Sequence, residues 1–474
     1  MESETPALLL ADLPTHVLSK IASFLLPGER LLLQLVCHAL RAAVSSPGAW
    51  SVLDLTPSGL CGGGEPSDAL INALVTLTEK AGGLVGTLRC AGPKAAEWCS
   101  KLIPANAVSL RCISLLLEPS VYLHLNWMYA LSSLVPQATF EVSSVCAKLP
   151  EDRLDNMACF LRGEAPFSSV RAKRIFVVPE RVTEEDDGSD DEQPASKVDV
   201  ESLARFIAAI PSHPSLCGIT LKHLDLSDAD LVFAAAASLS SLPLLRDVAL
   251  RGCWLAPPHC AGALATLLRS APRLAALIVD NNHAPVFGEG GDDAAALPLA
   301  LRASRLVRLD IDKARLWGSP AVGVALVDAL VGHPTLTALP LALNSAEGCE
   351  AAASEALARL VSATNPPCRL EALSLPFADL QDAGIALLMD AIRSSNSSLL
   401  ELNIRHNLQS GSSDGAVLAA VAAHPRLCRL AALSYAEGED LSDDHVASRA
   451  AQAKLRPLLA KAEAAAAARG VENL

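Results

Sequence analysis

The sequence predicts an α/β protein in which a short module of three helices precedes a long solenoid of alternating strands and helices. The pattern L-x-x-L-x-L-x-x-N/C occurs eight times from residue 221 onward, and amphipathic helical segments separate its copies. The 474 residues are 51% hydrophobic but only 4% aromatic. This composition favours one long repetitive body and excludes a disordered chain.

The net charge and the spacing of the cysteines indicate which partners, compartments and metal sites are expected. The 38 Lys and Arg against 52 Asp and Glu give a net charge of -14, which argues against nucleic acid or an anionic membrane as the main partner. The 13 cysteines occur singly, without a C-x-x-C motif, so we expect a reducing compartment and no zinc cluster. Met1 to Pro6 is acidic and no long apolar run follows, so we expect a cytoplasmic or nuclear protein without a membrane span.

Apolar residues at helical spacing predict three short helices within residues 8–55. The first stripe follows Leu13-Pro14 and ends at Pro27-Gly28, and a second stripe begins at Leu31. A bundle of about forty residues cannot bury so many apolar side chains by itself. We therefore expect part of this module to contact another protein.

The order of these residues resembles an F-box, the helical motif that binds the Skp-type adaptor of cullin-RING ubiquitin ligases. The resemblance spans residues 8–55 and rests on Leu13-Pro14, the pair Val36-Cys37 and the ending Pro47-x-x-Trp50. Two positions depart from it: Pro27-Gly28-Glu29 replaces a common helix-opening aspartate, and Leu40 stands near a usual aromatic residue. The resemblance implies adaptor contacts by Leu13, Pro14, Leu18, Ile21, Leu25, Leu31, Leu35 and Val36. The alternative is an N-terminal helical cap that uses the same leucines as core.

The repeated pattern predicts one short strand and one helix per copy. Its copies begin at Leu221, Leu245, Leu274, Leu306, Leu336, Leu370, Leu399 and Leu427. The ninth position is often Cys or Asn, whose side chain can satisfy backbone groups where the chain leaves the strand. This unit resembles the ribonuclease-inhibitor type of leucine-rich repeat, which implies a horseshoe with parallel strands on its concave face and helices outside.

The remaining segments are expected to extend or interrupt the array. We expect degenerate repeats over 56–180, a disordered acidic loop over 181–198, clear repeats over 199–435, and an acidic turn with capping helices over 436–474. Between residues 51 and 180, strands are expected at 52–55, 84–90, 108–117, 139–142 and 170–178, and helices at 68–80, 94–103, 122–135 and 151–161. Ser189, followed by two aspartates, resembles an acidophilic kinase site; the alternative is a plain solubilising loop.

We expect no enzymatic activity, cofactor or metal. No phosphate-binding, zinc-protease or nucleophile-elbow motif occurs, and Cys253, His259 and Cys260 lack a fourth ligand at a suitable spacing. The F-box resemblance instead implies a substrate-receptor subunit of a Skp-cullin-F-box ubiquitin ligase, with repeats that bind a protein substrate. The alternative is a leucine-rich-repeat scaffold, or a regulator similar to the Ran GTPase-activating proteins, without a ligase role.

The third, fifth and seventh residues of each copy are expected to point out of the concave face and contact the partner. In the first seven copies they include Asp225, Asp247, Asp280, Asp310, Asp312 and Glu401 against Arg251, Arg308 and Arg405. An uncharged stretch follows, with Ala338, Pro340, Ala342, Ala372, Ser374 and Pro376. We therefore expect a net negative face. In this face Asp280, Asp310 and Asp312 contact a basic segment of the ligand, and the uncharged stretch contacts an apolar segment. The alternative is that these acids only keep the solenoid soluble.

Overall fold

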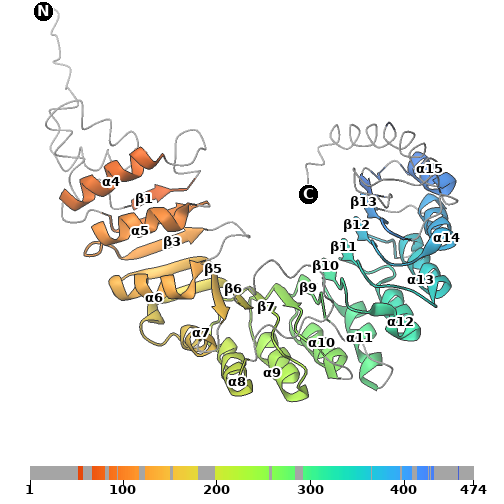
Figure 1. Ribbon diagram of the computed structural model, residues 1–474, viewed down its shortest axis with the longest axis horizontal. Helices are drawn as coiled ribbons and strands as arrows, with labels where there is room; N and C mark the ends of the chain where they lie inside the picture. The colour runs from red at the N-terminus through yellow and green to blue at the C-terminus, as the bar shows by residue number, and fades with distance from the viewer. Residues whose placement is uncertain are drawn as a thin grey trace, which may run out of the picture. The chain divides into compact units, whose positions relative to one another are not determined.

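The computed structural model describes most of the chain between residues 52 and 431 (Figure 1). The described residues are 52–56, 67–80, 85–92, 94–116, 123–149, 153–179, 198–255, 259–282, 292–364, 366–394, 398–407, 414–424, 426–427, 429–431 and 457. They belong to two compact units, which divide between Val177 and Val178. The eight expected adaptor contacts, Ser189 and the acidic turn at 436–444 lie outside the described residues.

The first unit is a set of parallel strands with helices between them. Its strand order is β1-β2-β3-β5-β6, and the short β4 pairs with β5. The strands are β1 (Val52–Leu55), β2 (Thr87–Ala91), β3 (Cys112–Leu116), β4 (Leu123–His124), β5 (Thr139–Leu149) and β6 (Val170–Pro179). The helices are α4 (Asp68–Lys80), α5 (Ala95–Ala105), α6 (Leu125–Leu134), α7 (Arg153–Arg162) and the 3-10 turn η5 (Phe167–Ser169). The expected strand and helix positions are confirmed with two differences: β5 runs seven residues beyond the expected end at 142, and the unexpected strand β4 occupies the start of the helix expected at 122–135.

The second unit repeats the strand–helix pair with neighbouring strands parallel and in chain order from β7 to β14. The strands are β7 (Gly218–Lys222), β8 (Asp247–Arg251), β9 (Ala276–Ile278), β10 (Arg308–Asp310), β11 (Ala338–Pro340), β12 (Ala372–Ser374), β13 (Glu401–Asn403) and β14 (Arg429–Ala431). The helices are α8 (Val200–Ala209), α9 (Ala229–Ser240), α10 (His259–Ser270), α11 (Asp292–Ala303), α12 (Pro320–Leu330), α13 (Glu350–Ser362), α14 (Gln381–Ser394), α15 (Asp414–Ala423), and the 3-10 turns η6 (Ile210–Ser212) and η7 (Leu316–Gly318).

Within this unit, the strands line the concave side and the helices lie outside them (Figure 1). The leucines of the pattern form the core between the two layers. Leu309 is 3% exposed, and its neighbours in the sheet are Leu277 on β9 and Leu339 on β11, both also buried. The α/β solenoid predicted from the pattern is therefore confirmed, as is the inward direction of its fourth position.

The first clear copy begins five residues earlier than the sequence suggested. Strand pairing aligns Leu221 with Leu250 and Ile219 with Val248, so this copy starts at Leu216 and not at Leu221. The apolar spacing continues past the strand and matches the pattern a second time, which explains the wrong register. As a consequence, Asp225 lies in the turn after β7, where its carboxylate accepts hydrogen bonds from the amide and hydroxyl of Ser227.

Buried side chains at the ninth position connect one copy to the next. Asn344 is fully buried, and its Oδ1 accepts hydrogen bonds from the amides of Ala314 and Leu316, at 3.1 and 3.0 Å. Its Nδ2 donates to the carbonyl of Ile311 at 2.8 Å. Asn282 and Asn407 bond neighbouring turns in the same way. The predicted role of this position in satisfying backbone groups is therefore confirmed.

Candidate functional site: the concave face of the repeats

In the corrected register, the outward positions of the second unit carry equal numbers of opposite charges. Over the described strands and the residues just after them, these positions hold Lys222, Arg251, Arg308, Arg405 and Arg429 against Asp247, Asp280, Asp310, Asp312 and Glu401. Compared with the register expected from the sequence, Asp225 is no longer at an outward position, Lys222 is at one, and the eighth copy adds Arg429. The expected net negative charge is therefore reduced to one excess acid over the first seven copies, because the first copy was placed in the wrong register, and Arg429 of the eighth copy balances that acid.

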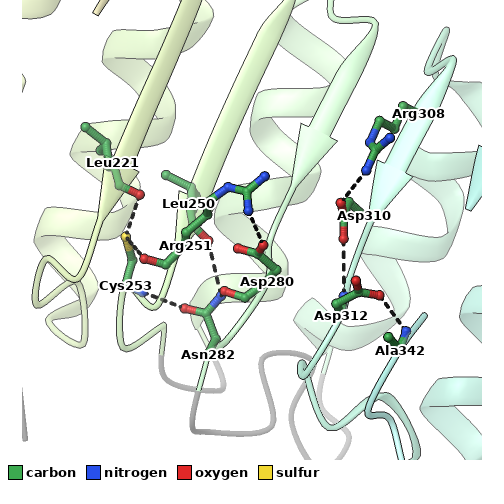
Figure 2. Close-up of polar contacts among 10 residues, drawn as sticks. All are labelled: Leu221, Leu250, Arg251, Cys253, Asp280, Asn282, Arg308, Asp310, Asp312 and Ala342. Atoms are coloured by element: carbon green, nitrogen blue, oxygen red, sulfur yellow. Dashed lines mark hydrogen bonds and ion pairs between the residues drawn. The ribbon is translucent and has the colours of Figure 1, made fainter. Parts of the chain in front are cut away.

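Two of the three aspartates expected to bind a basic ligand already have arginine partners (Figure 2). Arg251 on β8 donates to Asp280, which follows β9, at 2.7 Å. Arg308 donates to Asp310 on the same strand at 2.8 Å, and only 6% of the Asp310 side chain is exposed. The structure does bring Asp280, Asp310 and Asp312 together, but it neutralises the first two within the chain.

Asp312 has no arginine or lysine partner among the ion pairs of the described residues. Its Oδ1 accepts a hydrogen bond from the backbone amide of Ala342 on the next repeat (Figure 2). Burial and, secondly, the negative charge of Asp310 raise the pKa of the Asp312 carboxyl to about 6. Burial likewise raises the pKa of Asp280, although Arg251 opposes this effect. Asp312 thus links two neighbouring repeats through its hydrogen bond to Ala342, in addition to lying at an outward position.

Cys253 occupies the ninth position of its copy and is fully buried. Its thiol contacts the carbonyl oxygen of Leu221 at 3.3 Å (Figure 2), and burial raises the pKa of the thiol to about 12. In the described part of the chain, no group of three or more His, Cys, Asp or Glu could hold a metal ion. Cys253 therefore acts as a neutral link between turns.

The uncharged stretch forms a hollow on the concave face. The hollow has a volume of about 450 Å³ and extends from β10 to β14. The space lies over β11 and β12 because these strands present the small side chains of Ala338 and Ala372 where the neighbouring strands present Arg308 and Glu401. The predicted uncharged stretch is confirmed, and its small side chains leave space for a ligand.

Two large exposed apolar side chains, three residues after the ends of β11 and β12, were not expected. Leu343 and Phe377 occupy the eighth position of their copies and are 41% and 45% exposed. Both have a left-handed backbone, with φ of 57° and 56°. The Phe377 ring stacks on that of His406, with 4.2 Å between the ring centroids. If the in-and-out alternation of a strand continued past the seventh residue, the side chains of Leu343 and Phe377 would point inward. The sequence did carry a signal of a left-handed turn here, because Gly252 and Asn281 occupy the same position in earlier copies.

Comparison with known protein families identifies the N-terminal segment. Residues 10–56 match the F-box-like family model. The chain therefore combines an F-box-like segment with a leucine-rich-repeat solenoid of alternating parallel strands and helices. In the part of the chain that the structure describes, no helix is both long and apolar enough to cross a membrane.

The similar solved structures are distant. The chain resembles the Rad7 and Elc1 complex of yeast at 13% identity and a TM-score of 0.36, over 77% of each chain. It resembles the leucine-rich-repeat-containing protein LegL7 from Legionella pneumophila at 15% identity and a TM-score of 0.30, over 86% of this chain and 98% of that one. No curated protein matches the sequence.

Proposed function

We propose that this chain is the substrate-receptor subunit of a Skp-cullin-F-box ubiquitin ligase. In this proposal the F-box-like segment binds a Skp-type adaptor, and the concave face of the repeats holds a protein substrate for ubiquitin transfer by the other subunits. The observation that carries the proposal is the F-box-like match at residues 10–56, in one chain with a repeat array. The hollow on the concave face supports the second half of it, because it offers an open surface of suitable size to a protein segment.

The adaptor contact can be tested by changing the start of the F-box-like segment. Leu13→Ala with Pro14→Ala should abolish co-purification of the full chain with a co-expressed Skp-type adaptor, because apolar residues dominate such contacts. Leu299→Ala is a suitable control, because Leu299 is an exposed leucine on α11. Thermal unfolding should show that the repeats remain folded in both variants. Adaptor binding that survives the double change would contradict the proposed contact and favour a helical cap or a scaffold without a ligase role.

A further inference from the structure

The concave face is divided into charged and uncharged parts, and the division is sharp. All outward positions of β11 and β12, with the eighth positions after them, are uncharged: Ala338, Pro340, Ala342, Leu343, Ala372, Ser374, Pro376 and Phe377. Charged side chains bound this field on both sides, on the β10 copy and on the β13 and β14 copies. An apolar ligand segment placed on the field would therefore have charged borders at both of its ends.

The exposed charges of these borders are mainly positive. On the β10 side, Arg308 is 48% exposed and Lys313 is exposed, whereas the acids of the same copy are recessed. Asp310 is buried and paired with Arg308, and Asp312 is half-buried with its Oδ1 hydrogen-bonded to the backbone of the next repeat. A ligand that approaches from solvent therefore meets two cations before it meets either carboxylate.

The opposite border has the same sign. Arg405 is exposed after β13, and no ion pair of its guanidinium is found among the described residues. Arg429 on β14 is 44% exposed and pairs with Glu401, which is the exposed acid of this border. Lys313 and Arg405, two exposed cations without an ion pair among the described residues, thus lie at the two borders of the field, at the same end of the strands as Leu343 and Phe377.

We propose that the face between β10 and β14 binds an extended segment of a partner protein that has an apolar centre flanked by acidic residues on both sides. Four strand spacings of about 4.8 Å separate β10 from β14, which is about 19 Å, or about six residues of extended chain. The apolar centre covers Ala338, Ala372 and the exposed Phe377, and the flanking carboxylates meet the two cationic borders. The proposed ligand segment is acidic at its ends, whereas the sequence suggested a basic segment. The proposal rests on the proposed function and gives the chemistry of the substrate segment.

The test uses two labelled peptides and the purified full chain. One peptide has three glutamates on each side of Leu-Ala-Pro-Leu-Ala, and the other has lysines in place of the glutamates. Fluorescence anisotropy should show at least tenfold tighter binding of the acidic peptide, and this binding should weaken as salt is added. Equal or tighter binding of the lysine peptide, or no binding of the acidic one, would overturn the proposal.

Variants locate the site on the face. Lys313→Glu with Arg405→Glu should weaken the acidic peptide at least tenfold, and neither change breaks an ion pair found among the described residues. The matched control is Arg269→Glu with Arg302→Glu, which makes the same change in net charge on exposed positions of the helical layer. Equal effects of the two pairs would overturn the proposal, because they would show a general charge effect.

A bulky residue tests the apolar centre independently of charge. Ala372→Trp should fill the hollow and weaken binding at least tenfold, whereas Ala351→Trp on the exposed side of α13 should not. Light scattering of the chain alone tests whether a second copy of the chain occupies this face. If the chain self-associates and Lys313→Glu with Arg405→Glu abolishes the association, the face binds a second copy and the proposal is overturned. Adaptor binding is measured separately on the same samples, so its failure would contradict the ligase role and leave the peptide result standing.

Discussion

Replacing Asp312 by asparagine should stabilise the repeats at neutral pH. The Asp312 carboxyl accepts a hydrogen bond from the Ala342 amide, and the amide oxygen of asparagine can accept the same bond. The substitution removes the charge that burial and the neighbouring Asp310 make unfavourable. The change is therefore nearly isosteric and affects chiefly the electrostatic contribution.

The sign and size of the effect follow from the pKa of this carboxyl. It rises from 3.8 to about 6 on folding, so the folded chain holds the proton more tightly than the unfolded chain. The free energy of unfolding that this carboxyl contributes is therefore lost as the pH rises from about 4 to above 6. At about 1.4 kcal/mol per pH unit, the full penalty at pH 7 would be about 3 kcal/mol. Because the carboxylate is partly exposed to solvent, screening reduces the expected gain from asparagine to about 1–2 kcal/mol.

Urea unfolding at a series of pH values measures this gain directly. The Asp312→Asn variant should be more stable than the parent at pH 8, and the difference should vanish below about pH 4. Glu347→Gln, at an exposed position before α13, is the control and should leave stability unchanged at every pH. A variant that is less stable at pH 8, or a gain that does not depend on pH, would refute the reasoning.

Two further substitutions test packing inside the array. Leu309→Asp should cost several kcal/mol in urea unfolding, because it buries an unpaired charge among leucines; a parent-like midpoint would show that Leu309 does not face the core. Gly384→Ala should cost about 1–3 kcal/mol, since its new Cβ would lie 2.2 Å from the Ser354 Oγ on α13. Ser354→Gly should recover part of this loss, and failure to recover any would contradict the close contact of α13 with α14.

The repeat architecture could be predicted because its signal is carried by side chains of one kind at fixed spacing. Leucines at the first, fourth and sixth positions identify the strands, and Asn282, Asn344 and Asn407 identify the turns. The first copy was misplaced because its strand has Ile219 at the fourth position, while leucines continue beyond the strand end. Correcting this one copy lowers the excess of acids over bases on the first seven copies from three to one.

The pairing of charges was harder to predict than their positions. Arg251 and Asp280 stand at the seventh position of consecutive copies, so a correct alignment of copies places them side by side in neighbouring repeats. The burial of Asp310 and its pairing with Arg308 depend on side-chain packing within one strand, which spacing alone does not reveal. The exposure of Phe377 depends on a left-handed backbone that the strand pattern does not include. Local conformation and packing therefore decide which charges a ligand meets.

The central claim is that this chain joins a ubiquitin ligase through its F-box-like segment. It is tested most directly by mixing the purified full chain with a Skp-type adaptor and a cullin and measuring the mass of the assembly by size-exclusion chromatography with light scattering. We predict one assembly that contains one copy of each protein and is lost with Leu13→Ala and Pro14→Ala. Elution of the unmodified chain apart from the adaptor and the cullin would contradict the claim.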